Sequence, residues 1–156
     1  MIPIRNIYYM LAYAFQVLHE QGYKDVAAED FRNTAELLAA ILCKGVSVQI
    51  KRGLCRQYIT KQEPLASPRG KLEIGESIKT QALRKKQLVC AYDEFSVNAY
   101  TNRIIKTTMA VLLRADITKA RKKEIRKLLV FFDGVDTLDA HNINWNIQYD
   151  RNNQTY

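Results

Sequence analysis

The sequence is poor in the residues on which most metal sites and disulfide frameworks depend. Its 156 residues include three cysteines and two histidines. Cys43, Cys55 and Cys90 are widely spaced, are odd in number and form no C-x-x-C pair. A structural zinc site or a set of disulfides is therefore not expected. Cys43 lies in an apolar helical run and Cys90 in a strand-like run, so both are expected to be buried thiols.

The motifs of several enzyme classes are missing as well. There is no G-x-x-x-x-G-K-[ST] phosphate loop, no G-x-S-x-G nucleophile elbow and no H-E-x-x-H metal motif. No Asp or Glu is followed two positions later by Lys, so the D/E-x-K strand that holds Mg²⁺ in one class of nuclease is absent. The adjacent pair Asp93–Glu94 does not replace it, because neighbouring strand residues point to opposite faces. We expect no catalytic residue, no metal ligand and no cofactor in this chain.

Long apolar runs are also absent. No stretch approaches the ~18 apolar residues of a membrane span. Arg5 and Asn6 interrupt the opening, and no small-residue cleavage site follows it. A reduced, cytoplasmic location is the expectation.

What the chain does contain is the composition of an ordinary soluble domain with a basic surplus. Hydrophobic residues make up 47% and charged residues 26% of a chain long enough for one domain with a core. The formal net charge is +8. Such a surplus suits contact with nucleic acid, with an acidic protein surface or with nucleotide phosphates.

Two helices are predicted near the N-terminus. Apolar residues recur at helical spacing over residues 1–18, with Asn6 as a candidate N-cap. Asp30 is the expected cap of a second helix over residues 31–50. Because glycine disfavours a helix interior, that helix either ends at Gly45 or passes another backbone closely there.

An antiparallel β unit is predicted from about residue 54 to residue 95. LCRQYIT (54–60) and KLEIG (71–75) alternate apolar and polar residues, and the segment 64–70 between them is rich in proline and glycine. We therefore predict a hairpin-like pair. A third strand is expected over residues 88–92. Whether the unit closes into a barrel is left open by the sequence.

The clearest helical pattern lies within residues 93–113, with Ser96 placed to cap it. Apolar side chains follow one another at three- and four-residue steps: Val97, Tyr100, Ile104, Met109, Val111 and Leu112. Another set falls away from this stripe: Asn98, Asn102, Arg103, Lys106 and Thr107. Either this polar side is solvated, or Asn102 and Arg103 belong to a contact surface, and periodicity alone does not decide between them.

A strongly basic helix is predicted next, with Thr118 as its N-cap. Its inward side is expected to carry Ile125, Leu128, Leu129 and Phe132. Its other side is expected to carry five cations: Arg121, Lys122, Lys123, Arg126 and Lys127. A solvated face explains these cations, and contact with phosphates or with an acidic partner is the alternative.

The predicted fold class is α+β. Helices near the N-terminus precede a small antiparallel β unit, and further helices follow it. Alternation through Ile143, Trp145 and Ile147 predicts a terminal strand. No internal repeat is present, so residues 1–156 are expected to form a single domain.

Several segments together resemble one known family. In chain order they are IPIRNIYYMLAYA (2–14), KGV (44–46), RGL (52–54) with Tyr58, GKLE (70–73) and NRIIKTT (102–108). In order and spacing they resemble the N-terminal region of McrC, the nuclease subunit of the McrBC 5-methylcytosine-specific restriction system. This is a type IV restriction system of DNA defence.

The resemblance implies a partner rather than an active site. In that family McrC associates with an AAA+ ring GTPase, McrB, stimulates its GTP hydrolysis and cuts DNA through a C-terminal PD-(D/E)-x-K domain. The implied cofactors are therefore GTP on the partner and Mg²⁺ in the nuclease domain. This sequence stops where that domain would begin, so we expect a cloned fragment or a truncated chain of a restriction endonuclease subunit.

The expected function is docking on, and activation of, an McrB-type GTPase, with methylated DNA reached through the complex. Interaction residues often lie on loops above a rigid scaffold. The predicted contact surfaces are accordingly the loop 64–70, with Arg69 and Lys71, and the five cations of the basic helix. As an alternative, the basic residues at 119–127 meet phosphates, and the chain is a DNA-binding module that positions DNA for the nuclease.

A structural role is predicted for four further residues. Asn102 and Arg103 are expected to hydrogen-bond the end of the preceding strand at Asp93 and Glu94, and so to fix the turn between strand and helix.

Overall fold

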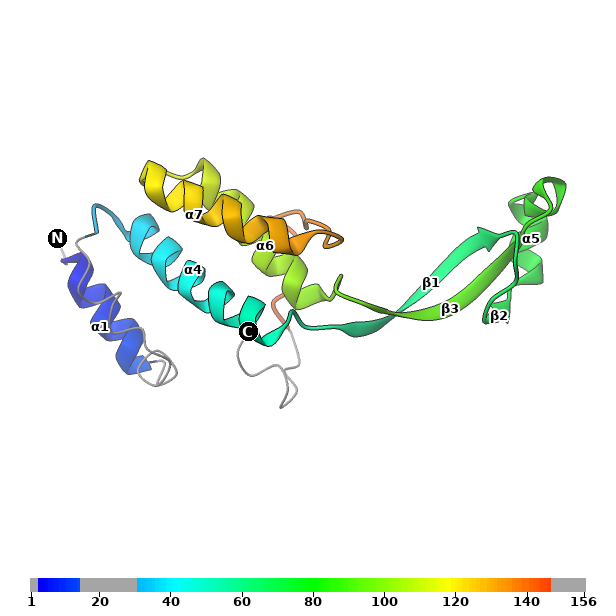
Figure 1. The fold of residues 1–156 in the computed structure, drawn as a ribbon, viewed down its shortest axis with the longest axis horizontal. Coiled ribbons are helices and arrows are strands. Elements are labelled where there is room, and N and C mark those ends of the chain that lie inside the picture. Colours follow the sequence, from blue (N-terminus) through cyan, green and yellow to red (C-terminus); the bar gives the residue numbers. More distant parts are fainter. Residues whose placement is uncertain (1–2, 15–30, 147–156) are drawn as a thin grey trace. The chain divides into compact units, whose positions relative to one another are not determined.

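The protein is described by a computed structural model that covers residues 3–14 and 31–146, and its contacts divide the chain into two compact units (Figure 1). Residues 1–54 and 100–156 make up the helical unit, and residues 55–99 make up the β unit. The described ranges contain five α-helices and one three-stranded antiparallel sheet. The α+β class is confirmed, and the sheet does not close into a barrel. Among the described helices, none is long and apolar enough to cross a membrane.

The helical unit begins with α1 (Ile4–Ala14), which packs on α4 (Thr34–Arg52). A cluster of apolar side chains joins the two helices, with its centre at Tyr8, Leu37 and Ala40. Asn6 lies inside α1 and not at its cap, and its N–H donates to the Pro3 carbonyl at 2.9 Å.

The cap of α4 is Asn33 and not Asp30. The Asn33 side chain accepts from the Glu36 N–H at 2.8 Å, and so satisfies one of the free N–H groups of the first turn. The helix continues through Gly45 and ends at Gly53, whose φ of 92° stops it. Lys51 and Arg52 occupy its last turn, where cations interact favourably with the helix dipole.

The other helices of this unit are α6 (Tyr100–Arg114) and α7 (Lys119–Leu129), followed by the 3₁₀-helix η2 (Val130–Phe132). α4, α6 and α7 contact one another (Figure 1). The fully buried side chains of this unit include Leu37 in α4, Met109 in α6, Ile125 in α7 and Phe132 in η2.

The predicted beginning of the third helix was wrong by several residues. Residues 93–96 belong to strand β3 (Leu88–Ser96), and α6 begins at Tyr100. The Ser96 hydroxyl accepts from the Asn98 N–H at 3.1 Å, so it closes the turn after the strand and does not cap the helix. Thr118 was predicted correctly as the cap of α7, since its side chain accepts from the Arg121 N–H.

The terminal strand predicted around Ile143 and Trp145 is not present in the described residues, and Ile147 lies outside them. Two side chains of α6 take up backbone N–H groups of this segment. The Leu138 N–H donates to Thr107 Oγ1 and the Asn144 N–H to Tyr100 Oη, both at 2.8 Å. Bonds of this kind replace the strand ladder that the alternation suggested.

In the β unit, β3 is the central strand. β1 (Gln57–Leu65) pairs with it along its whole length, and β2 (Lys71–Leu72) pairs with its other edge. The predicted hairpin between residues 54–60 and 71–75 was therefore wrong, because both segments pair with β3. The turn at Gly70, with a φ of 69°, lies between β1 and the strand that joins the opposite edge.

Short helices follow β2, namely α5 (Ile74–Lys79) and the 3₁₀-helix η1 (Ala82–Lys85), and both contact β3 (Figure 1). Ser77 connects α5 to the sheet. Its hydroxyl accepts from the Val89 N–H at 2.7 Å and donates to the Glu73 carbonyl at 2.9 Å. The buried Ser77 hydroxyl thus links α5 to β3 through hydrogen bonds.

Candidate functional site

The candidate site is a set of exposed surfaces, together with the side-chain contacts that fix their positions. Within residues 3–14 and 31–146, no three His, Cys, Asp or Glu side chains gather as they would around a metal ion. Charged and exposed apolar residues gather instead in the β unit after β1, along α7, and at the junction of α4 with α7.

Arg69, predicted as a contact residue, lies in a loop shorter than expected. Pro64 and Leu65 belong to β1, so the loop itself is residues 66–70. The Arg69 guanidinium lies over the Tyr92 ring, 4.3 Å from its centroid, which places it for a cation–π interaction. The Tyr92 hydroxyl donates to the Glu63 carboxylate, and this hydrogen bond raises the pKa of Tyr92. Arg69 is thus exposed and held in a defined position.

Lys71, the second predicted contact in this region, is also exposed and pairs with Glu73 at 2.8 Å. The hydrogen bond to Glu73 raises the pKa of Lys71 above its ordinary value. Between the two cations, Gly70 passes against the sheet. A Cβ at position 70 would lie 2.7 Å from Tyr92 Cβ and closer still to the Ala91 carbonyl oxygen. The loop can approach β3 this closely only with glycine.

An exposed aliphatic group follows these cations along the chain and was not predicted. It consists of Leu72, Ile74, Ile78 and Leu83, which are between 44% and 63% exposed. Exposed apolar side chains scattered singly are normal, but a concentration of them marks a contact surface. The sequence contained one sign of it. Ile74 and Ile78 are four residues apart, so a helix places them on the same side.

The basic helix α7 divides its charges between two sides. At 3.6 residues per turn, five cations fall within an arc of about 140°: Lys119, Lys122, Lys123, Arg126 and Lys127. Lys122 is half-buried and the other four are exposed. Arg121 falls on the opposite side, with Ile125 and Leu128. Helical spacing alone places Arg121 on the inner side, so its prediction as a member of the outer cationic side was wrong.

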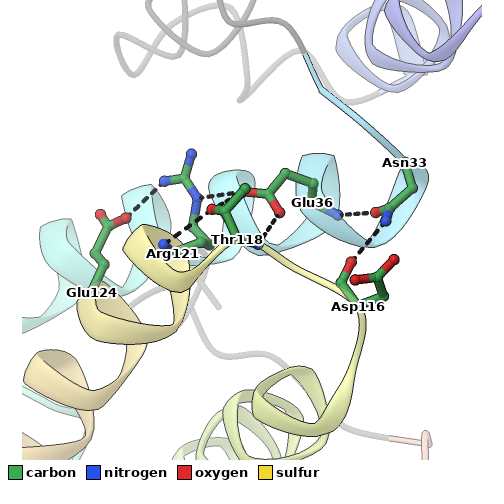
Figure 2. Close-up of polar contacts among 6 residues, drawn as sticks. All are labelled: Asn33, Glu36, Asp116, Thr118, Arg121 and Glu124. Carbon is green, nitrogen blue, oxygen red and sulfur yellow. Dashed lines mark hydrogen bonds and ion pairs between the residues drawn. The ribbon is translucent and has the colours of Figure 1, made fainter.

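Arg121 belongs to a polar cluster between α4 and α7 (Figure 2). Its Nη1 donates to Glu124 Oε2 at 2.7 Å, and its Nε lies 3.7 Å from Glu36 Oε1. Glu36 is only 5% exposed. The Arg121 side chain therefore faces the interior of the helical unit.

Glu36 also holds the beginning of α7 (Figure 2). Its carboxylate accepts from the Thr118 N–H at 2.7 Å and from the Thr118 hydroxyl at 2.8 Å. Asn33 adds a further link, because its Nδ2 donates to the Asp116 carbonyl at 2.7 Å. A buried carboxylate needs such partners, and here each of its oxygens has one. The cluster fixes α7 on α4.

Asp93 and Glu94 form cross-strand contacts within the sheet. Asp93 accepts from the Thr60 hydroxyl at 2.7 Å, and Glu94 pairs with Lys61, which raises the pKa of Lys61. Asn102 is fully buried in the helical unit. Arg103 Nε is buried without an acceptor in the described part of the chain. The proposed hydrogen bonding of Asn102 and Arg103 to the strand end stays a prediction.

The polar side of α6 is not simply solvated, because two of its residues hold a segment far along the chain. The Lys106 ammonium donates to the Phe132 carbonyl at 3.1 Å and to the Val135 carbonyl at 2.5 Å. Thr107, which is buried, binds the Leu138 N–H. These contacts involve a segment about thirty residues away, and helical periodicity does not reveal such partners.

Comparison with known proteins supports the resemblance. The family described as "McrBC 5-methylcytosine restriction system component" matches residues 4–156. The type IV methyl-directed restriction enzyme EcoKMcrBC of Escherichia coli (strain K12) is 33% identical over 138 residues, which cover 88% of this chain and 40% of that protein. The chain thus spans less than half of that relative's length.

Two solved structures share the fold. One is the cryo-EM structure of the Thermococcus gammatolerans McrBC complex, with a TM-score of 0.64, 19% identity, and coverage of 98% of this chain and 47% of the matched chain. The other is a half-complex from a tetradecameric assembly of Thermococcus gammatolerans McrB AAA+ hexamers with bound McrC. There the TM-score is 0.65 and the identity 21%, over 98% of this chain and 38% of that one.

Proposed function

The chain belongs to the McrBC 5-methylcytosine restriction system component family, and we propose that it is the part of an McrC-like subunit that docks on an McrB-type AAA+ GTPase ring. In this proposal docking stimulates GTP hydrolysis by the ring, in a complex that restricts methylated DNA. The family membership supports the assignment, and so does the fold shared with a chain from an assembly described as McrB AAA+ hexamers with bound McrC.

The observation that carries the docking role is the exposed aliphatic group of the β unit. Leu72, Ile74, Ile78 and Leu83 are about half exposed to water, so burying the remainder of each against a partner would contribute about 0.8–1.5 kcal/mol, half the value for a fully exposed side chain. In a typical interface a few well-packed side chains supply most of the binding energy. Arg69 and Lys71, beside them in the chain, add positive charge that speeds association with an acidic surface.

Stimulation requires more than binding. A partner raises the rate only if it binds the hydrolysis-competent arrangement of the ring more tightly than the others. We propose that the β unit does this, because its loop is held in one geometry by Gly70 and by the Arg69–Tyr92 contact. A contact surface already fixed before binding loses little conformational freedom on docking.

The experiment is a GTPase assay of the cognate ring protein with and without this chain. The wild-type chain should raise the GTPase rate. The double variant Ile74→Ser/Ile78→Ser should lower that stimulation about tenfold or more, because two of the four aliphatic anchors are lost.

The matched control is Val111→Ser/Val130→Ser, which removes two exposed aliphatic side chains from the helical unit. It should stimulate the ring as the wild-type chain does. Equal GTPase rates with and without the wild-type chain would remove the activating role. Equal loss in both double variants would remove the assignment of docking to the β unit.

A further inference from the structure

α7 carries a charged surface that docking through the β unit does not use. We call Lys119, Lys122, Lys123, Arg126 and Lys127 the cationic face. Within the residues that the structure describes, none of these five side chains forms an ion pair, and Glu124, the acidic residue of this helix, is taken by Arg121.

Most charges on this face do not stabilise the helix that carries them, although Arg126 and Lys127 lie in its last turn, where cations suit the helix dipole. Lys119–Lys123, Lys122–Arg126 and Lys123–Lys127 are like-charge pairs four residues apart, an arrangement that destabilises a helix. Lys119 also lies at the N-terminal end, where the helix dipole disfavours a cation, and the first turn contains no acidic residue. A bound polyanion would relieve both effects at once.

The chemistry of the face favours a phosphate backbone over a protein partner. The cores of protein interfaces are depleted in lysine and enriched in aromatic and apolar side chains. The five members of this face are all cations, and the exposed Val130 and Phe131 lie beyond the end of α7. Half or more of the hydrogen bonds between proteins and DNA go to phosphate and sugar, and lysine and arginine are among their main donors.

The length of the face suits duplex DNA. From residue 119 to residue 127 a helix rises about 12 Å, at about 1.5 Å per residue. Over that distance duplex DNA carries about seven phosphate charges, at one per about 1.7 Å. We propose that the cationic face of α7 binds the sugar-phosphate backbone of duplex DNA, without preference for sequence or methylation. This surface is distinct from the proposed ring-docking surface and does not depend on it.

The test is a fluorescence anisotropy titration of a labelled duplex with the full chain, at salt concentrations from about 50 to 200 mM. The variant Lys119→Gln/Lys123→Gln/Lys127→Gln should bind at least about tenfold more weakly at the lowest salt. Its plot of log affinity against log salt should be shallower by about 2.7, at roughly 0.9 per phosphate contact. Methylated and unmethylated duplexes of the same length should bind equally well.

The matched control is Arg84→Gln/Lys85→Gln/Lys86→Gln, which removes an equal number of positive charges from exposed positions in the β unit. It should keep the wild-type affinity and salt slope. Absence of binding at about 50 mM salt, or equal weakening in the two triple variants, would overturn the proposal. An α7 variant that keeps DNA affinity but loses GTPase stimulation would assign the face to an acidic protein partner instead, and would also overturn it.

Discussion

The helical unit and the β unit differ in what they bury. The helical unit encloses large side chains such as Leu37, Met109 and Phe132, together with the carboxylate of Glu36. The buried residues of the described β unit have small or medium-sized side chains: Ser77, Ala82, Val89, Cys90 and Ala99. Large aliphatic side chains of the β unit remain exposed. The helical unit exposes large apolar side chains too, among them Val130 and Phe131, so the two units differ in what they bury and not in what they expose. We therefore expect the helical unit to contribute most of the stability of the chain.

The largest effect should follow a loss of core volume in the helical unit. Phe132 is fully buried, so Phe132→Ala removes apolar contacts and leaves a cavity, at a cost of about 3–5 kcal/mol in the free energy of unfolding. Chemical denaturation measures it. Phe131, its neighbour in the chain, is 58% exposed, and Phe131→Ala should change the free energy of unfolding by much less. Similar losses for both phenylalanines would contradict the position of the core.

The buried polar cluster should give the next largest effect. Glu36→Gln removes the charge beside Arg121, whose side chain is 14% exposed, and weakens the contacts to Thr118. The expected loss is about 1.5–3 kcal/mol, the range for hydrogen bonds to charged groups. Glu124→Gln is the control, since the Glu124 side chain is 44% exposed and water screens its charge. If Glu124→Gln destabilised the chain more than Glu36→Gln, the cluster would not hold α7 as described.

A smaller and more local effect is expected in the β unit. Gly70→Ala would place a methyl group against the Ala91 carbonyl in a backbone conformation that alanine disfavours, at a cost of about 1–3 kcal/mol. Hydrogen exchange at Glu73, whose N–H donates to the Val89 carbonyl, should become faster.

Gly75 offers the contrasting change. A Cβ at position 75 meets nothing within 4 Å, so Gly75→Ala in α5 should be neutral or should stabilise the unit by up to about 1 kcal/mol. Identical hydrogen-exchange profiles for the two variants would show that the approach of the loop to β3 does not matter.

The last effect is confined to alkaline pH and concerns buried thiols, one in each unit. Burial, with a further contribution from Glu124, raises the pKa of Cys43 to about 12 from its ordinary 9.0. Between these two values the unfolded chain loses the thiol proton while the folded chain retains it, so stability contributed by Cys43 falls as pH rises. Cys43→Ala should remove this part of the alkaline loss of stability.

Thiol labelling of the native chain sharpens the same comparison. Cys43 and Cys90 are both fully buried, so each reacts only when its surroundings open. Because the β unit has fewer buried contacts, Cys90 should react faster than Cys43 in mass-spectrometric labelling at pH 8. If Cys43 reacted first, the helical unit would not be the more stable part.

Three features could be predicted because each depends on local pattern: the α+β class, the strand-like nature of residues 57–60 and 88–92, and the cap at Thr118. The continuation of β1 through Pro64 and Leu65 was not predicted. The pairing of β2 with β3 could not, since it depends on a turn at Gly70 and on contacts that no alternation encodes. The polar residues of α6 show the same limit. Lys106 and Thr107 looked like solvated positions because their partners, Val135 and Leu138, lie far along the chain.

The candidate surfaces were predicted in part. Arg69 and Lys71 are exposed, as the composition of their loop predicted. The composition of the loop did not predict the exposed aliphatic side chains that follow it in the chain. Arg121 shows the opposite case, because its spacing from Ile125 already assigned it to the inner side of α7. The charge of Arg121 groups it with the other cations of α7, but its helical position does not.

The register of the sheet also has a consequence for how such chains diversify. Gln57 at the beginning of β1 is the direct partner of Ser96 at the end of β3. A segment whose first and last residues are neighbours can be lengthened, shortened or exchanged while the chain still leaves and re-enters the helical unit at the same two points. Residues 57–96 therefore form a segment that can be exchanged as one piece; if this unit docks on a ring protein as we propose, its exchange would change the partner and leave the helical unit unchanged.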